Sequence, residues 1–465
     1  PSPDPSSTTT RRSGGRVWAA TLSSASRTTR GLRYTGTITA IRTGSRLHGP
    51  PRVSPRFSRT KGGMAEGSPS RASGRRSVGA VRSLSARRPA QVWRVFSYDG
   101  LAIAVTGTRK DHLQWLSECL TPAFDVDVDP GAHCRVALVT DTARHGRLVG
   151  LGPHRDGGDA DCFLLDSRIA SARRWTSEGG GGVVVRDEEF DVFYRVTHGG
   201  RVVEVVSREA WRWSRVALMR VVRELAMNHS RRTGGLFLHA AAFTDTQGTG
   251  FVVAGPKCAG KTTLLMHALR SGVFQLVSND RVLVRAGRDG VVARGMPTLV
   301  GVRAPSLKLL PGLARDLGLQ PGMHCLTQNE SRRARVLGGR DGERDLLLTP
   351  AQFATLLDAP QAGACRVAGM IFPEVDRGEK GLVLERLGPR DTYARLTESL
   401  FAVGLPVPEH GVFAAGLNGA AEGRGDPRAN FPALLTEVPA FSCRLGAGAY
   451  DDPAATAEVL SRLLP

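Results

Sequence analysis

The segment from Phe251 to Asp280 constrains the fold of this chain more than any other stretch. Its sequence is FVVAGPKCAGKTTLLMHALRSGVFQLVSND. The apolar run from Phe251 to Ala254 suits a short buried strand, and the apolar residues after Lys261 recur at helical spacing. Between them lies the pattern G-x-x-x-x-G-K-T, in which backbone N–H groups at a helix N-terminus surround a phosphate. The segment therefore predicts a strand, a phosphate-binding loop and a helix, in that order.

The loop pattern predicts a role for each of its residues. The backbone would bind the phosphates of a nucleoside triphosphate such as ATP, Lys261 would reach the β- and γ-phosphates, and the Thr262 hydroxyl would ligate Mg²⁺. The alternative is a glycine-rich turn in which Lys261 is only a solvated charge, and the full spacing between strand and helix favours the phosphate-binding loop. The predicted nucleotide-binding residues are Gly255, Pro256, Lys257, Cys258, Ala259, Gly260, Lys261, Thr262 and Thr263.

The positive charge of the chain is concentrated near its start. The formal net charge is +20, and residues 1–90 carry 18 basic and two acidic residues. The other 375 residues carry 45 basic and 41 acidic residues, so their charge gives no support to nucleic-acid binding. Residues 1–90 are also rich in Ser, Arg, Thr, Gly and Pro with little apolar periodicity, which predicts a disordered leader.

Three interpretations of this leader compete. It could be a basic arm that binds nucleic acid or anionic lipid, or an Arg- and Ser-rich transit peptide. It could also come from a misassigned translation start, because the chain opens with Pro1 and its first methionine is Met64. The last interpretation is favoured, because a start at Met64 removes residues 1–63 and leaves every predicted folded element in place.

The cysteines and the apolar runs bear on the compartment. Seven cysteines are scattered without a C-x-x-C pair, which argues against a disulfide framework or a thiolate zinc site and for a reducing cytoplasm. No apolar run approaches the roughly 18 residues that a membrane helix needs. We therefore predict a cytoplasmic protein with no membrane partner; whether it forms a homo-oligomer stays open.

Residues 91–232 are predicted to form a small mixed α/β domain with a strand-rich sheet. Asp99-Gly100 and His198-Gly199-Gly200 each separate two strand-like runs, which is typical of hairpins. A helix from Arg208 to Ser230 closes the region with an apolar stripe that includes Trp211. Its arginine-rich face is predicted to be solvated, with contact to phosphate as the alternative.

Residues 235–402 are predicted to form the nucleotide domain, followed by a tail, residues 403–465, with a closing helix at Pro453 to Leu464. A strand from Leu236 to Phe243 precedes the strand of the phosphate-binding loop. A second strand is expected to start at Leu276 and to continue through Asn279 and Asp280 to Arg285. Further expected elements are a helix capped by Thr349, a strand from Val367 to Phe372, a strand from Gly381 to Leu387, a helix from Arg390 to Val403 and an irregular loop from Leu313 to Arg344.

Taken together, His239, the loop and Asp280 resemble the HPr kinase/phosphorylase family and its bacterial relatives, which have a PEP-carboxykinase-like fold. That family has a His-bearing strand, a G-x-x-x-x-G-K-S/T loop, a helix ending in Gly and a strand with Asp-Asp-Arg-Val. The corresponding segments here read LHAAAF, GFVVAGPKCAGKTT, RSG and LVSNDRV. The resemblance covers residues 235–300, and by element order it extends to residue 402. It implies an α/β protein in which a strand-rich domain precedes a PEP-carboxykinase-like P-loop domain.

The resemblance also implies site residues. Asp280 matches the acidic residue that acts as base near the attacking hydroxyl and helps to organise Mg²⁺, and His239 matches a histidine near the phosphates. The alternatives are a strand-end carboxylate that caps a turn and a histidine satisfied within the core. Two departures stand out. Asn279 replaces the first Asp, although its carbonyl oxygen can still ligate Mg²⁺. Val292 stands where a metal-side Glu is expected, whereas Arg294 and Gly295 match.

These observations predict a divergent, Mg²⁺- and ATP-dependent kinase rather than a dual kinase/phosphorylase. It would transfer the γ-phosphate to a hydroxyl of a protein, a peptide or a small molecule other than HPr. The predicted catalytic residues are Asp280, His239 and Lys261, and the predicted metal ligands are Thr262, Asp280 and Asn279. The alternatives are a non-catalytic or slow ATP-binding regulator and a P-loop ATPase. Met370 to Glu374 weakly resembles the acidic strand of such ATPases. Nucleic-acid binding would be confined to residues 1–90.

Overall fold

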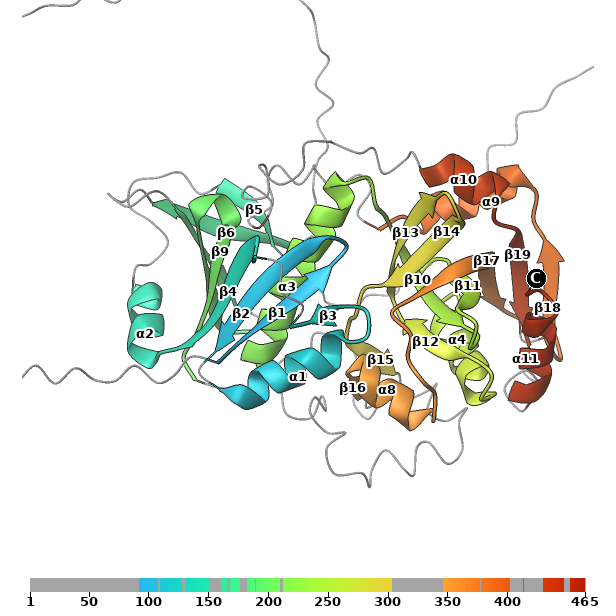
Figure 1. The fold of residues 1–465 in the computed structure, drawn as a ribbon, viewed down its shortest axis with the longest axis horizontal. Coiled ribbons are helices and arrows are strands. Elements are labelled where there is room, and N and C mark those ends of the chain that lie inside the picture. The colour runs from blue at the N-terminus through green and yellow to red at the C-terminus, as the bar shows by residue number, and fades with distance from the viewer. Residues whose placement is uncertain are drawn as a thin grey trace, which may run out of the picture. The chain divides into compact units, whose positions relative to one another are not determined.

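The chain divides into two units, Pro1–Ser83 and Leu84–Pro465, and every residue described below belongs to the second. The computed structural model describes residues 92–107, 109–127, 131–150, 160–164, 168–175, 182–188, 190–209, 212–302, 346–376, 378–401, 413, 430–446 and 452–464. This part has a mixed α/β fold with two large sheets (Figure 1). The leader, Trp211 and the loop from Leu313 to Arg344 lie outside the described residues.

The first sheet contains nine strands in the order β3-β1-β2-β4-β9-β8-β7-β6-β5. Strand β4 pairs in parallel with both β2 and β9, and the other neighbours are antiparallel. The predicted hairpin joins β1 to β2 through Asp99 and Gly100, both at positive φ. The strands are β1 (Val92–Tyr98), β2 (Leu101–Gly107), β3 (Asp125–Val126), β4 (Cys134–Thr140), β5 (Ala160–Leu164), β6 (Arg168–Trp175), β7 (Gly182–Asp187), β8 (Val192–Thr197) and β9 (Val202–Ser207).

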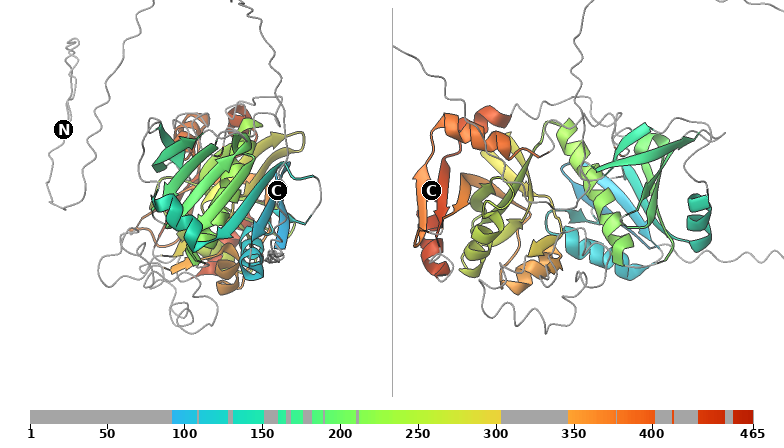
Figure 2. Two further views of the ribbon diagram at one scale, coloured as in Figure 1. Left: turned by 90° about the vertical axis from the view of Figure 1, so that its left-hand side faces the viewer. Right: turned by 180° about the vertical axis from the view of Figure 1, so that it is seen from behind.

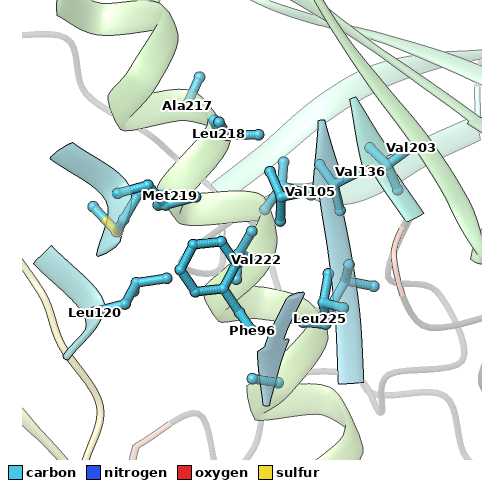
Figure 3. Packing of buried hydrophobic residues seen from close by; sticks show 14 of the residues in the cluster. Phe96, Val105, Leu120, Val136, Val203, Ala217, Leu218, Met219, Val222 and Leu225 are labelled. Carbon is cyan, nitrogen blue, oxygen red and sulfur yellow. The ribbon is translucent and has the colours of Figure 1, made fainter. Parts of the chain in front are cut away.

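Helices α1 (Lys110–Leu120), α2 (Thr142–Gly150) and α3 (Arg212–Arg232) accompany this sheet, and a 3-10 turn (His198–Gly200) forms the second predicted hairpin. Figure 3 shows apolar residues of α3 packed against residues of β1, β2 and β4. The expectation that the arginine face of α3 is solvated is wrong, because Arg220 and Arg223 are only 8% and 3% exposed. The physical reason is that α3 contacts α1 and the first sheet and also β10 of the second sheet, so that little of it faces water.

The second sheet contains eight strands, seven of which follow the order β11-β10-β13-β14-β17-β19-β18. Strand β12 pairs with β10, and β11 pairs with β17, so the path from β11 to β17 closes on itself. The strands are β10 (Leu236–Thr244), β11 (Thr249–Ala254), β12 (Gln275–Ser278), β13 (Arg281–Gly287), β14 (Gly290–Gly295), β17 (Ala364–Val375), β18 (Leu382–Arg386) and β19 (Ala440–Leu445). A separate pair consists of β15 (Val300–Val302) and β16 (Leu346–Leu348).

Helices cover both faces of the second sheet (Figures 1 and 2). One face packs against α4 (Lys261–Arg270), α8 (Pro350–Leu356) and α11 (Pro453–Ser461). The other face packs against α9 (Pro389–Glu398) and α10 (Phe431–Thr436). Helix α8 begins as predicted, with Thr349 and Gln352 forming a capping box before a first turn that contains Pro350. No helix in the described ranges combines the length and the apolar character needed to cross a membrane.

Two sequence-based expectations for the second sheet need correction. The strand expected to run from Leu276 to Arg285 is broken at Asn279 and Asp280 into β12 and β13. The break is stabilised by the Ser278 hydroxyl, which donates to the Arg281 carbonyl at 2.6 Å. The region after residue 402 was expected to be a tail with only a closing helix. It also supplies β19, which lies between β17 and β18 and pairs in parallel with β17.

Candidate functional site

The strand–loop–helix order predicted from Phe251 to Asp280 is present. Strand β11 ends at Ala254, and α4 begins at Lys261, with Gly260 as its N-cap in the left-handed region. In the loop between them, Gly255 is buried, Ala259 and Gly260 are half-buried, and Pro256, Lys257 and Cys258 are exposed. The loop therefore leaves the sheet and presents its tip to solvent at the N-terminus of a helix, where backbone N–H groups lack intrahelical partners.

Glycine is favoured at position 260 by its backbone conformation, and the surroundings leave little room for a side chain. Its φ is +105°, which side-chain-bearing residues rarely adopt. A Cβ atom at Gly260 would lie 3.1 Å from Cγ2 of Val375, at the end of β17. The loop thus passes close to the carboxyl end of a strand that runs parallel to β11.

Lys261 is folded back over the loop. Its side chain is buried, and its Nζ donates to the carbonyl oxygens of Gly255 at 2.8 Å and Pro256 at 2.9 Å. Burial lowers the pKa of Lys261, and the electrostatic effects of Asp280 and Cys258 act in the opposite direction. Thr262 and Thr263 follow in the first turn of α4 and are half-buried.

Strand β10 lies between β11, which leads into the loop, and β13, which follows Asp280. His239 lies opposite Arg281, the first residue of β13, and the next residue, Ala240, lies opposite Ala254, the last residue of β11. The phosphate-binding loop and the break that contains Asp280 therefore both leave the sheet at this level of β10. Because β11 and β12 both run antiparallel to β10, their carboxyl ends, Ala254 and Ser278, lie at nearby positions of β10, opposite Ala240 and Ala242.

His239 and Asp280 face one another across this point. His239 Nε2 lies 3.0 Å from Asp280 Oδ1, and Arg281 Nε lies 3.5 Å from Asp280 Oδ2. The side chains of His239 and Asp280 are 37% and 36% exposed, so both remain accessible. Burial alone would raise the pKa of Asp280, but the hydrogen bond from His239 and the charges of Arg281, His239 and Arg223 outweigh it and lower the pKa below its ordinary value. Asp280 is therefore held as a carboxylate.

Asn279 is buried. It is 8% exposed, and its side-chain Nδ2 donates to Thr298 Oγ1 at 3.3 Å. Within the described ranges, no group of three or more His, Cys, Asp or Glu side chains is arranged to hold a metal ion. Of the three predicted metal ligands, Asp280 and Thr262 have side chains that are at least partly accessible, whereas Asn279 is buried.

The segment from Val291 to Gly295 has a different place from the one implied by the resemblance. Val292 is 42% exposed and lies opposite Arg285, in the part of β13 remote from Asp280. Arg294 donates from Nε to the Ala123 carbonyl at 3.0 Å, away from the loop. Gly295 lies beside the break, where a Cβ would come within 2.1 Å of the Val277 carbonyl oxygen. Only Gly295 of these residues therefore shapes the candidate site.

Sequence reasoning missed three residues that act on Asp280 or on its neighbour Arg281. Met227 and Arg223 come from α3, and Phe401 follows α9; Met227 and Phe401 contact Arg281, and the charge of Arg223 acts on Asp280. The arginines of α3 were the only signal in the sequence for this part of the site. Comparison of the chain with protein-family models and with curated proteins gave no match.

Proposed function

We propose that this protein is a Mg²⁺- and ATP-dependent phosphotransferase, similar to HPr kinases, that acts on a hydroxyl of a protein, a peptide or a small molecule in the cytoplasm. One observation carries the proposal. A paired carboxylate and imidazole, Asp280 and His239, lie beside a glycine-rich loop at a helix N-terminus, joined to it through β10. Phosphoryl transfer requires positioning of phosphates, neutralisation of charge and acceptance of one hydroxyl proton, and this set of residues supplies all three.

The roles follow from the chemistry of each group. The loop amides and Lys261 would bind the phosphates, with Lys261 exchanging its bonds to Gly255 and Pro256 for phosphate oxygens. Asp280 would accept the proton of the acceptor hydroxyl, and His239 would orient Asp280 through Oδ1. Thr262 and Asp280 offer the hard oxygen ligands that Mg²⁺ prefers, and Mg²⁺ needs few protein ligands because it retains water and phosphate oxygens. When bound, Mg²⁺ supplies neutralisation of the charge on the transferred phosphoryl group.

The test is transfer of labelled phosphate. The full-length protein would be incubated with γ-labelled ATP and Mg²⁺, with itself, a peptide library and small-molecule alcohols as acceptors. The proposal predicts label in at least one acceptor, lost in Asp280→Asn while ATP binding remains. ATP binding with no label in any acceptor and no difference between the wild-type protein and Asp280→Asn would contradict it.

A slow or non-catalytic ATP-binding regulator is the second candidate. The observation in its favour is Asn279, whose side-chain amide is engaged by Thr298 where the related kinases have a second carboxylate. The missing acid at Val292 no longer supports it, because Val292 lies opposite Arg285 and not beside Asp280. This candidate predicts that ATP affinity is the same in the wild-type protein and in Asp280→Asn, with no transferred phosphate in either.

A P-loop ATPase is the third candidate. Strand β17 is hydrogen-bonded in parallel to β11, and Glu374 lies near its carboxyl end. This arrangement favours a role for Glu374 in activating water, because ATPases carry an acid at the end of a strand next to the loop strand. The ATPase predicts phosphate release without an acceptor and loss of that release in Glu374→Gln but not in Asp280→Asn.

A further inference from the structure

Arg281 connects the candidate site to two distant parts of the chain. Its side chain is buried, and its Nε lies 3.5 Å from Asp280 Oδ2. Its guanidinium carbon lies 4.2 Å from the ring centroid of Phe401, and its Nη1 donates to Met227 Sδ at 3.8 Å. Asp280 contacts Nε of the planar guanidinium, Phe401 its face and Met227 its Nη1. Together the three contacts restrict the rotation of the guanidinium.

Phe401 is itself tied to the strand that carries His239. The Phe401 amide donates to the Phe237 carbonyl at 2.9 Å, and the His239 amide donates to the Ser399 carbonyl at 2.7 Å. The segment from Ser399 to Phe401 therefore runs along β10 beside His239. Because Arg281 stacks on Phe401, the guanidinium and the imidazole that engage the two oxygens of Asp280 are held by the same short piece of sheet.

Met227 adds a contact from the N-terminal region. It is buried on α3, in the core that includes the first sheet. Thioether sulfur is a weak acceptor, so the bond to Arg281 contributes more to orientation than to energy. Through this contact, the position of α3 bears directly on the arginine beside Asp280.

We propose that Arg281 is a positioning residue that holds Asp280 in register with His239 and couples its orientation to α3 and to the segment at Phe401. Asp280 then has Oδ1 in contact with His239 Nε2 and Oδ2 within ion-pair distance of Arg281 Nε. The effect on catalysis rests on the proposed function, whereas the effect on the geometry of Asp280 and His239 does not. Misplacement of a catalytic group by about 1 Å can lower a rate about 100-fold.

The test compares three substitutions in the full-length protein. Arg281→Met removes the guanidinium and keeps an unbranched chain, and Arg281→Lys keeps the charge without the planar edge. Arg294→Met is the matched control, because Arg294 lies on the adjacent strand β14 and also stacks on an aromatic ring, that of Tyr98 at 5.0 Å, outside the site. The first readout is the ¹³C-labelled His239 imidazole signal at one fixed pH, assigned with His239→Gln. The second is the rate of label transfer from γ-labelled MgATP to an acceptor that the wild-type protein labels.

The proposal predicts a shifted His239 signal in Arg281→Met, an intermediate shift in Arg281→Lys and none in Arg294→Met. It predicts that kcat falls about 10- to 100-fold in Arg281→Met and recovers in part in Arg281→Lys, while the Kd for MgATP changes less than about threefold. An unchanged His239 signal in Arg281→Met, or the same shift in Arg294→Met, would overturn the proposal. If the wild-type protein transfers no label to any acceptor, the proposed kinase function fails and the imidazole signal still decides the role of Arg281.

Discussion

Two arginines of β13 bind carboxylates in contrasting ways. Arg285 engages Asp99 through two bonds, Nε to Oδ1 at 3.0 Å and Nη2 to Oδ2 at 2.5 Å. It also donates to the Thr233 carbonyl at 2.8 Å, to the Thr233 hydroxyl and to the Ser230 carbonyl. Arg281 engages Asp280 through one longer contact of 3.5 Å, and the other oxygen of Asp280 is directed to His239.

The difference separates a structural pair from a candidate catalytic one. The Asp99 side chain is 16% exposed, and both of its oxygens accept hydrogen bonds from Arg285, which also bonds Thr233 and Ser230. We call Asp99 and Arg285 the structural pair. It fixes the β1–β2 hairpin to β13 and the end of α3. The Asp280 side chain is 36% exposed and its partners include a titratable group. We infer that the structural pair contributes to stability, whereas Asp280, with His239 beside it, is available for proton transfer.

The largest effect is expected on ATP turnover, at the phosphate-binding loop near Asp280 and His239. Lys261→Met should lower MgATP turnover at least about 100-fold, because it removes the buried cation expected to bind the phosphates. Lys257→Met, at an exposed position of the same loop, serves as the control and should change turnover far less. Turnover would be followed by phosphate release or by transfer of label, and equal losses in both variants would break the assignment of Lys261.

The next largest effect is expected on stability, at the structural pair of Asp99 and Arg285. Asp99→Asn should lower the free energy of unfolding by about 2 kcal/mol, because a guanidinium bonded to several oxygens loses its charged partner. Asp111→Asn is the control: its pair with Arg109 is exposed and should contribute less than about 1 kcal/mol. Urea denaturation would measure both, and a smaller loss in Asp99→Asn than in Asp111→Asn would contradict the comparison.

The smallest effect is expected at Val292, where the proposed similarity to HPr kinases implies a further acid. Val292→Glu should change the Mg²⁺ dependence of turnover less than about twofold, because Val292 is exposed and lies opposite Arg285, not Asp280. Titration of Mg²⁺ at fixed ATP would measure it. A tenfold gain in Mg²⁺ affinity would show that Val292 lies closer to the metal than its register in β14 implies.

Features determined by neighbouring residues could be predicted from the sequence. The hairpin at Asp99 and Gly100 has both residues at positive φ, as such turns require. The capping box at Thr349 and the strand, loop and helix around Lys261 also follow local rules. These elements account for the position of the loop, and the mixed α/β architecture follows from their order.

Features that depend on distant segments could not be predicted. Strand β19 enters the sheet between β17 and β18 although it comes after both in the chain. The burial of Arg220 and Arg223 depends on what covers the second side of α3, which no periodicity within α3 reveals. Likewise, the stacking of Arg281 on Phe401 depends on a segment that runs along β10 and comes from far along the chain.

The sequence singled out residues that the structure brings near one another, but it did not predict their geometry. His239 and Asp280 pair directly, and the charge of Asp280 acts on Lys261. The break between β12 and β13 that exposes Asp280 was expected to be continuous strand, because Ser278, Asn279 and Asp280 lie between two apolar runs. The bond from the Ser278 hydroxyl to the Arg281 carbonyl, which stabilises the break, has no signature in the pattern.

The central claim is that Asp280 acts in catalysis and Asp99 in stability. The most direct test measures both properties in both variants, Asp280→Asn and Asp99→Asn. Label transfer from ATP and urea unfolding would be measured on the same preparations. Asp280→Asn should lower transfer about 100- to 10,000-fold, because a general base is lost, with little change in stability. Asp99→Asn should lower stability and leave transfer by the folded protein near the wild-type rate. Loss of transfer in Asp99→Asn equal to that in Asp280→Asn, or full transfer by Asp280→Asn, would contradict the account.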